Sequence, residues 1–245
     1  MRVPRLYIDQ PLASGDALAL NRRALDHAVK VLRLRAGDPL CLFNGQGGEF
    51  AAVLVRGAGG TLLAQIGEHA SDRRESPLSV CLVQGISRGE RMDYTLQKAV
   101  ELGVAHIVPV VTERTVSRVA DERASRRLEH WRGVVLAACE QSGRTRVPPV
   151  AEPRRLAEHL AGTLSGVGLL LDPTAPQALT QTGPYAGVVS VLIGPEGGLT
   201  DDERRAAQAA GYRPVRMGPR VLRTETAAVV ALALLQAQGG DLAGG

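Results

Sequence analysis

Cysteine is scarce in this chain of 245 residues, and the spacing of the few cysteines argues against cysteine-based sites. Cys41, Cys81 and Cys139 are odd in number and lie far apart in the sequence. We therefore expect neither a disulfide framework nor a CxxC metal site, and reduced thiols in a cytoplasmic protein instead. The five histidines form no HxH or HxxxH pair, so no metal site is expected.

Long apolar runs are also missing. No segment approaches the ~18 consecutive apolar residues of a membrane span, and the first residues, MRVPRLYIDQ, lack the apolar stretch of a signal peptide. We therefore expect no membrane partner. Aromatic residues make up only 3% of the chain, which disfavours an RNA-binding surface of stacked aromatic rings.

Lysine is almost absent, although the chain is mildly basic with 29 Lys plus Arg against 25 Asp plus Glu. Only Lys30 and Lys98 are lysines. The planar guanidinium group of arginine suits contacts with phosphates and bases. A general preference for arginine codons explains the excess equally well, so the placement of the basic residues is more informative than their number.

Basic side chains gather between residues 21 and 35, where Asp26 is the one acid. Such a cluster is typical of a surface that binds a polyanion, although a solvated face is the alternative. We predict RNA contacts for the five basic residues of this segment, which are Arg22, Arg23, Lys30, Arg33 and Arg35. His27, in the same segment, is expected to pack or cap, and Cys139 to be a small core residue.

Turn signals and short apolar runs predict a small β-barrel over residues 1–70, interrupted by one short helix at about 23–34. The polar segment 71–77, SDRRESP, is the predicted linker. From 78 to 245 apolar runs alternate with helical patterns, which predicts an α/β domain with a mostly parallel sheet covered on both faces. In such sheets ligands bind beyond the carboxyl ends of the strands.

The second domain is expected to contain strands at 78–86, 106–111, 167–172, 187–193 and 214–217. Its expected helices are 91–103, 124–142, 200–210 and 224–238.

The most informative stretch is IGPEGGLTDDE, residues 193–203, in which three glycines fall within five residues between a strand and a helix. It matches neither GxGxxG nor a Walker A loop. Thr200 and Glu203 predict a capping box, and three carboxylates crowd the first turn of the helix. A phosphate is therefore disfavoured, and we expect main-chain polar groups, not fixed positive charge, to meet adenosine edges or a sulfonium. A turn made only for packing is the alternative.

A second bend lies about twenty residues further on, in RMGPRVLRTETAA, residues 216–228. Gly218 and Pro219 predict the bend, and Thr224 is the predicted N-cap of the last helix, with Glu225 in its first turn. Two such strand-to-helix bends are suited to line one cleft from two sides.

IGPEGGLTDDE together with MGPRVLRTETAAV resembles the C-terminal signature of the SPOUT methyltransferases that modify N3 of a uridine in 16S ribosomal RNA. Further segments similar to that family, in the family's order, are HAVKVLRLRAGD (27–38), RMDYTLQKAVELGV (91–104), VTERTVSR (111–118) and AACEQSGR (137–144). Ser87 and Arg88 stand where the family usually has a lysine, and Met217 where leucine is common; both departures are mild.

The resemblance implies a PUA-like barrel for RNA, a SPOUT α/β domain with a trefoil knot, a homodimer, and S-adenosylmethionine (SAM) bound at the knot. The implied substrate is 16S rRNA or the small ribosomal subunit, and Arg88 and Arg114 join the predicted RNA contacts. Position by position, the implied cofactor pocket comprises Leu171, Ile193, Gly194, Glu196, Gly197, Met217, Gly218, Leu222, Arg223 and Thr224.

SAM carries an activated methyl group, so side chains would supply positioning and electrostatics. Uridine N3 bears a proton, and its attack needs a base or a cation that stabilises charge on O2 and O4. Our hypothesis is that Arg223 or Arg144 is the cation and that Glu140 or Glu225 is the base. The alternatives are that Glu225 serves the helix dipole and that Arg144 contacts a helix end or an RNA phosphate.

Two other function classes compete with this interpretation. One is a non-catalytic RNA-binding ribosome-assembly factor that has kept the fold, which SAM binding would argue against. The other is a nucleotide-dependent oxidoreductase on a doubly wound sheet, which the missing GxGxxG and the acidic helix start disfavour.

Overall fold

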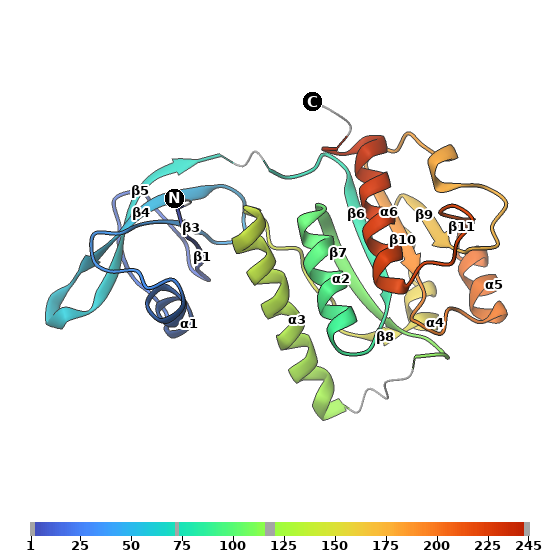
Figure 1. Cartoon of the computed structure of the whole chain (residues 1–245), viewed down its shortest axis with the longest axis horizontal. Helices are drawn as coiled ribbons and strands as arrows, with labels where there is room; N and C mark the ends of the chain where they lie inside the picture. Colours follow the sequence, from blue (N-terminus) through green and yellow to red (C-terminus); the bar gives the residue numbers. More distant parts are fainter. Residues whose placement is uncertain (1–2, 72–73, 116–120, 243–245) are drawn as a thin grey trace. The chain divides into compact units, whose positions relative to one another are not determined.

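The computed structural model describes residues 3–71, 74–115 and 121–242, without the side chains of residues 121–124 (Figure 1). The chain forms two compact units. The first comprises residues 1–75 and 139–147, and the second comprises residues 76–138 and 148–245. Each unit has its own sheet and its own hydrophobic core.

The first unit is built on a five-stranded sheet in the order β1-β3-β4-β5-β2. Its strands are β1 (Arg5–Tyr7), β2 (Ala17–Ala19), β3 (Pro39–Phe43), β4 (Glu49–Arg56) and β5 (Leu62–Ala70), with a 3-10 turn η2 (Ala58–Gly60) before β5. β1 runs parallel to β3, and the other neighbours are antiparallel. Alternate side chains such as Leu40, Leu42 and Leu54 are buried in one core. The expected series of short strands is confirmed.

The helix expected at about 23–34 is shorter and less regular in the structure. α1 (Arg22–Asp26) begins after Asn21, whose side chain accepts a hydrogen bond from the Ala24 amide at 2.9 Å. It continues into a π-helical turn, η1 (His27–Val31). Arg33 then has a φ of 57°, which ends the helix. The apolar periodicity runs past this point, so the sequence overestimated the helix length.

A buried ion pair and a hydrogen bond attach segment 139–147 to the rest of the first unit. Arg144 donates from Nε to the Glu75 carboxylate at 3.1 Å, and its carbonyl accepts from Arg5 at 3.2 Å. Arg5 in turn pairs with Glu49. The side chains of Arg5 and Arg144 are only 7% and 8% exposed. Removing one partner would therefore leave a buried charge uncompensated.

The domains predicted from the sequence were contiguous, at 1–70 and 78–245 with a linker at 71–77. In the structure the chain passes into the second unit after Glu75, within that predicted linker, and returns to the first unit at 139–147. Helical periodicity predicts that a helix exists but not which core its last turn packs against. The sequence therefore does not predict that residues 139–147 return to the first unit.

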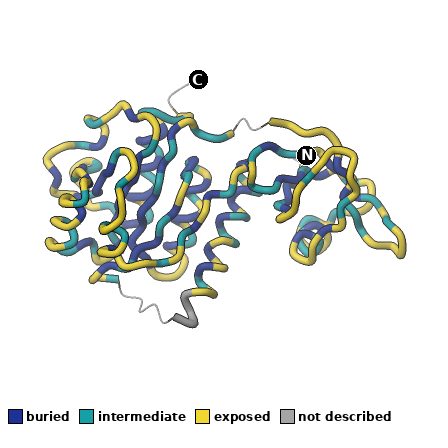
Figure 2. The backbone as a smooth tube through the Cα atoms, turned by 180° about the vertical axis from the view of Figure 1, so that it is seen from behind, coloured by how far each residue is buried: buried dark blue, intermediate teal, exposed yellow. Residues whose placement is uncertain are grey.

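The second unit contains a parallel sheet of six strands in the order β11-β9-β10-β6-β7-β8. The strands are β6 (Ser79–Gly85), β7 (Val104–Val111), β8 (Arg154–Arg155), β9 (Val167–Leu171), β10 (Val188–Ile193) and β11 (Tyr212–Val215). Figure 2 shows that the central strands are largely buried. The expected parallel sheet is confirmed, with the two-residue β8 as an addition that the sequence did not signal.

Helices cover both faces of this sheet, as expected (Figure 1). α2 (Glu90–Glu101) and α6 (Thr224–Gly239) pack against each other and against β6, β7 and β10. On the opposite face α4 (Leu156–Leu160) and α5 (Asp201–Ala209) share a core cluster with the strands. A 3-10 turn, η3 (Leu179–Gln181), contacts α6. α3 (Asp121–Ser142) is the long helix whose last turn belongs to the first unit, where Cys139 is buried as expected.

No helix within the described ranges has the length and apolar character that a membrane span requires.

His159 and Tyr212 connect α4 to β11 through a hydrogen bond of 3.0 Å between the imidazole Nε2 and the phenol oxygen. Burial, with a contribution from the charge of Arg154, lowers the pKa of His159 below its ordinary value of 6.5. Burial raises the pKa of Tyr212 to about 12. Both groups are therefore neutral in the folded protein near neutral pH.

Because the unfolded chain takes up a proton on His159 more readily than the folded chain, acidification should destabilise the fold. We expect the free energy of unfolding to fall as the pH drops below about 6.5 toward the lower folded pKa. His159→Gln should reduce this loss, whereas His106→Gln, at an exposed position, should leave it unchanged. Urea titrations at several pH values measure the free energy of unfolding of each variant. Equal pH dependence of this free energy in both variants would contradict the assignment of the loss to His159.

Candidate functional site

A cavity of about 500 Å³ opens beyond the carboxyl ends of β9, β10 and β11 in the second unit. This is where a parallel sheet is expected to bind ligands. Eight of the ten residues predicted to form a cofactor pocket line it, namely Leu171, Ile193, Gly194, Glu196, Met217, Leu222, Arg223 and Thr224. Gly197 and Gly218 belong to the same two bends without lining the cavity. The two bends therefore do face one cleft.

The first bend, residues 193–198, is held in place by side chains from other segments. The Glu196 carboxylate accepts hydrogen bonds from the Arg88 amide at 3.0 Å and from the Arg91 guanidinium at 3.1 Å. Partial burial alone would raise the pKa of Glu196, but these hydrogen bonds and the Arg91 charge hold it below its usual range. Arg114 donates to the Gly197 carbonyl at 3.1 Å. Glu196, Arg88 and Arg114 thus have contacts that fix the turn.

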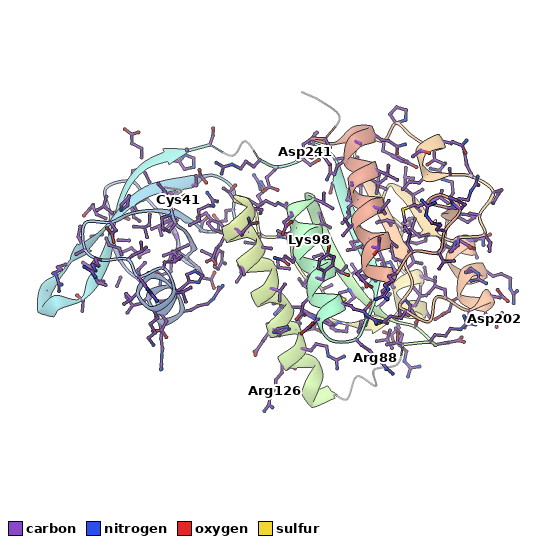
Figure 3. All side chains as sticks on the ribbon, in the orientation of Figure 1. Cys41, Arg88, Lys98, Arg126, Asp202 and Asp241 are labelled. Atoms are coloured by element: carbon purple, nitrogen blue, oxygen red, sulfur yellow. The ribbon has the colours of Figure 1, made fainter. Side chains whose placement is uncertain are left out.

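The predicted capping box after this bend is present. Thr200 Oγ accepts from the Glu203 amide at 3.2 Å, and the Glu203 carboxylate accepts from the Thr200 amide at 2.9 Å. Asp201 and Asp202, also in the first turn of α5, pair with the arginines three residues further on, and Figure 3 labels Asp202. Much of the negative charge that we expected to repel a phosphate is therefore compensated.

The expectation that the cavity lacks fixed positive charge is wrong. Arginines on its wall are Arg91, Arg204, Arg216, Arg220 and Arg223, against the acids Asp172, Glu196 and Glu225. Arg91, Arg204 and Arg216 are engaged with Glu196, Asp201 and the Ala175 carbonyl, respectively. The exposed side chains of Arg220 and Arg223 have no polar partner among the described residues. Positive charge therefore stays available at the wall.

Thr224 does not cap the last helix, contrary to prediction. α6 begins at Thr224 itself, and its N-cap position, Arg223, makes no side-chain cap. The Thr224 hydroxyl instead donates to the Gly194 carbonyl at 2.7 Å and accepts from Gln84 Nε2 at 2.9 Å. Sequence reasoning missed Gln84, whose one signal is a polar residue at the end of the apolar run LSVCLV.

Glu225 follows on the cavity wall, where it is half-buried. Its Oε2 is buried and has no hydrogen-bond partner in the described part of the chain. A buried carboxylate oxygen without a donor is costly, because it has lost water without gaining a partner. Such an atom on a cavity wall is suited to accept a hydrogen bond from a ligand.

Comparison with known proteins shows the family to which the chain belongs. Residues 74–236 match the family described as RNA methyltransferase domain, and residues 20–66 match the RNA methyltransferase PUA domain. The chain belongs to this RNA methyltransferase family. Ribosomal RNA small subunit methyltransferase E of Buchnera aphidicola subsp. Schizaphis graminum is 31% identical over 98% of each chain. The protein of the same name in Synechocystis sp. is 37% identical over 90% of this chain and 73% of its own.

Two solved methyltransferases share the complete fold. Ribosomal RNA small subunit methyltransferase E from Neisseria gonorrhoeae, bound to S-adenosyl methionine, has a TM-score of 0.91 and 38% identity over 98% of this chain and 99% of its own. A putative methyltransferase from Legionella pneumophila, in complex with SAM, has a TM-score of 0.94 and 38% identity, over 98% of this chain and all 100% of its own. The expected PUA-like first unit and α/β second unit are confirmed for this methyltransferase.

The remaining catalytic candidates of this methyltransferase, Arg144 and Glu140, lie in the first unit and do not line the cavity. Arg144 is engaged with Glu75, and the Glu140 carboxylate accepts from the Tyr7 amide at 3.0 Å. These contacts give both residues a structural part in the first unit. Their catalytic part stays a prediction.

The predicted RNA contacts of the methyltransferase are exposed. Five of them lie in α1 and η1 or shortly after η1 in the first unit, namely Arg22, Arg23, Lys30, Arg33 and Arg35. Arg88 (Figure 3) and Arg114 are exposed next to the first bend in the second unit. Their role in RNA binding stays a prediction. Within the described ranges no three His, Cys, Asp or Glu residues are arranged to hold a metal ion.

Gly85, at the end of β6, allows the first bend to approach the sheet. A Cβ atom at this position would lie 2.4 Å from the Pro195 nitrogen and 2.8 Å from the Gly194 carbonyl carbon. Gly85→Ala should therefore displace the bend and destabilise the protein by about 1–3 kcal/mol, as overpacking does. Gly133→Ala is the matched control, because that Cβ meets open space on α3.

We expect the free energy of unfolding from urea titration to rise by about 0.5–1 kcal/mol in Gly133→Ala, since alanine favours helix. Equal stability of Gly85→Ala and the wild type would show that the bend tolerates displacement, against this interpretation.

Proposed function

We propose that this protein methylates N3 of a uridine in 16S ribosomal RNA with SAM as the methyl donor, and that the cavity beside the two bends holds SAM. The observation that carries the proposal is the likeness, over 98% of the chain, to two methyltransferases whose structures contain SAM. The specific base and position rest on the resemblance of the two signature segments.

The cavity fits such a ligand in size and chemistry. Its volume of about 500 Å³ lies within the ~300–1,000 Å³ of small-molecule sites. Leu171, Ile193 and Leu222 offer apolar surface, and the unpartnered Oε2 of Glu225 offers an acceptor. When bound, SAM supplies an activated methyl group on a sulfonium. The chain's own residues then have to orient the uridine and manage its N3 proton.

Arg223 is the best-placed cation in this scheme, because it lies on the cavity wall and its side chain has no polar partner among the described residues. Its charge would stabilise the negative charge that spreads onto O2 and O4 of the uridine as N3 loses its proton. Glu225, on the same wall, is the base that this geometry favours over Glu140. Both assignments are parts of the proposal.

We further propose that the enzyme acts as a homodimer on 16S rRNA or the small ribosomal subunit. The exposed basic residues around α1 and η1 support RNA binding by the first unit. Contacts of this kind are made to phosphates and weaken as salt concentration rises. Dimer formation rests on the family resemblance.

Arg223→Ala should lower the single-turnover rate of methylation by about 100-fold, the usual scale for removing one transition-state stabiliser. SAM binding by calorimetry should persist in this variant. Arg213→Ala is the control, because Arg213 is exposed on β11 and does not line the cavity. An unchanged rate in Arg223→Ala would remove this residue from the mechanism.

A deletion strain tests the substrate directly. Mass spectrometry of 16S rRNA nucleosides should show that N3-methyluridine is lost on deletion and restored by the wild-type gene. Restoration by Arg223→Ala should be slow or incomplete. Retention of N3-methyluridine in the deletion strain would contradict the proposed base, whereas the absence both of SAM binding and of RNA methylation would favour the assembly-factor alternative.

A further inference from the structure

Gln84 is a fully buried polar residue in a largely apolar strand. It lies near the end of β6, in register with Ile193 of β10 and Pro109 of β7, and its relative exposure is 0%. Burying an amide is costly unless its polar atoms are hydrogen-bonded. Gln84 Oε1 has no partner in the described part of the chain, so the amide is only half satisfied. A buried amide with an unsatisfied oxygen calls for a reason other than stability.

The contacts of the amide nitrogen fix the direction of two further hydrogen bonds. Gln84 Nε2 lies 3.0 Å from the Gly85 carbonyl and 2.9 Å from Thr224 Oγ. Because a carbonyl can only accept, the nitrogen must be the atom on this side of the amide. The Thr224 hydroxyl therefore accepts from Gln84 and uses its single proton for the Gly194 carbonyl, 2.7 Å away. The hydrogen bonds are therefore donated in one direction, from Gln84 of β6 to Thr224 of α6 and from Thr224 to Gly194 of the first bend.

These hydrogen bonds link β6 to two segments that line the cavity. Thr224 opens α6 and Gly194 opens the first bend, and both line the cavity. Gln84 does not line it, so it can influence a ligand only through Thr224 and Gly194. The geometry points to Gln84 as a positioning residue that holds the Thr224 hydroxyl and the Gly194 carbonyl in the arrangement that binds SAM. This inference rests on the proposed function.

A buried glutamine elsewhere in the second unit provides a matched control. Gln236 on α6 is also 0% exposed, donates to the Leu102 carbonyl at 3.0 Å and accepts from Ser76 Oγ at 2.6 Å. None of these three residues lines the cavity. Gln236→Met should therefore destabilise the protein without weakening SAM binding. If Gln84 only stabilised the fold, Gln84→Met would behave in the same way.

Calorimetric titration of the full-length protein with SAM, paired with urea unfolding, separates the two roles. We expect Gln84→Met and Thr224→Val each to weaken SAM binding about tenfold, because a buried hydrogen-bonding group loses its partner. Thr224→Ser, which keeps the hydroxyl, should retain most of the affinity.

The double variant Gln84→Met/Thr224→Val is decisive. If Gln84 acts through Thr224, the losses of SAM affinity in the two single variants should not add. The double variant should therefore bind SAM about as weakly as Thr224→Val alone. Additive losses would overturn the inference, as would equal changes of affinity in Gln84→Met and Gln236→Met. If Gln84→Met does not fold, equal affinities of Thr224→Val and Thr224→Ser would overturn it. Failure of the wild type to bind SAM would reject the proposed function itself, together with this inference.

Discussion

The hydrogen bond from the Thr224 hydroxyl to the Gly194 carbonyl joins the two bends that form the site. Without this hydrogen bond, the Thr224 side chain would not hold the start of α6 to the first bend. Three further contacts hold the first bend, from Arg88 and Arg91 to Glu196 and from Arg114 to Gly197. A turn held from several sides loses little conformational freedom on binding, which is the condition for preorganised recognition.

The charges around the cavity divide into two groups by their partners. Arginines engaged with acids or carbonyls, such as Arg91 and Arg204, are parts of the wall. Arg220 and Arg223, without a polar partner among the described residues, present positive charge to an incoming molecule. Residue type alone does not separate these two groups, since all are arginines.

The first unit includes a segment that is remote in sequence, residues 139–147. The buried ion pair between Arg144 and Glu75 and the hydrogen bond from Arg5 of β1 to the Arg144 carbonyl connect residues 139–147 to the rest of the first unit, and Arg5 also pairs with Glu49. Such pairs stabilise little relative to apolar packing, but breaking one leaves an unpaired buried charge. Substitution of Arg144 therefore affects folding of the first unit whatever part it has in catalysis. This dual effect has to be separated in any assay of Arg144 variants.

The sequence by itself determined the features that depend on neighbours in the chain. Alternating strands and helices implied the parallel sheet, and the Thr200–Glu203 capping box was readable because its partners are three residues apart. The two signature segments also contain seven of the eight predicted pocket residues that line the cavity, and Leu171 is the eighth. Only the tertiary structure decided which partner Thr224 takes and that Gln84 takes part at all. It also decided that Arg144 pairs with Glu75. The partners in these contacts are far apart in the sequence: Thr224 and Gly194 by 30 residues, Gln84 and Thr224 by 140, and Arg144 and Glu75 by 69. Hydrogen-bonding capacity is visible in a residue type, but its partner is set by how distant segments pack.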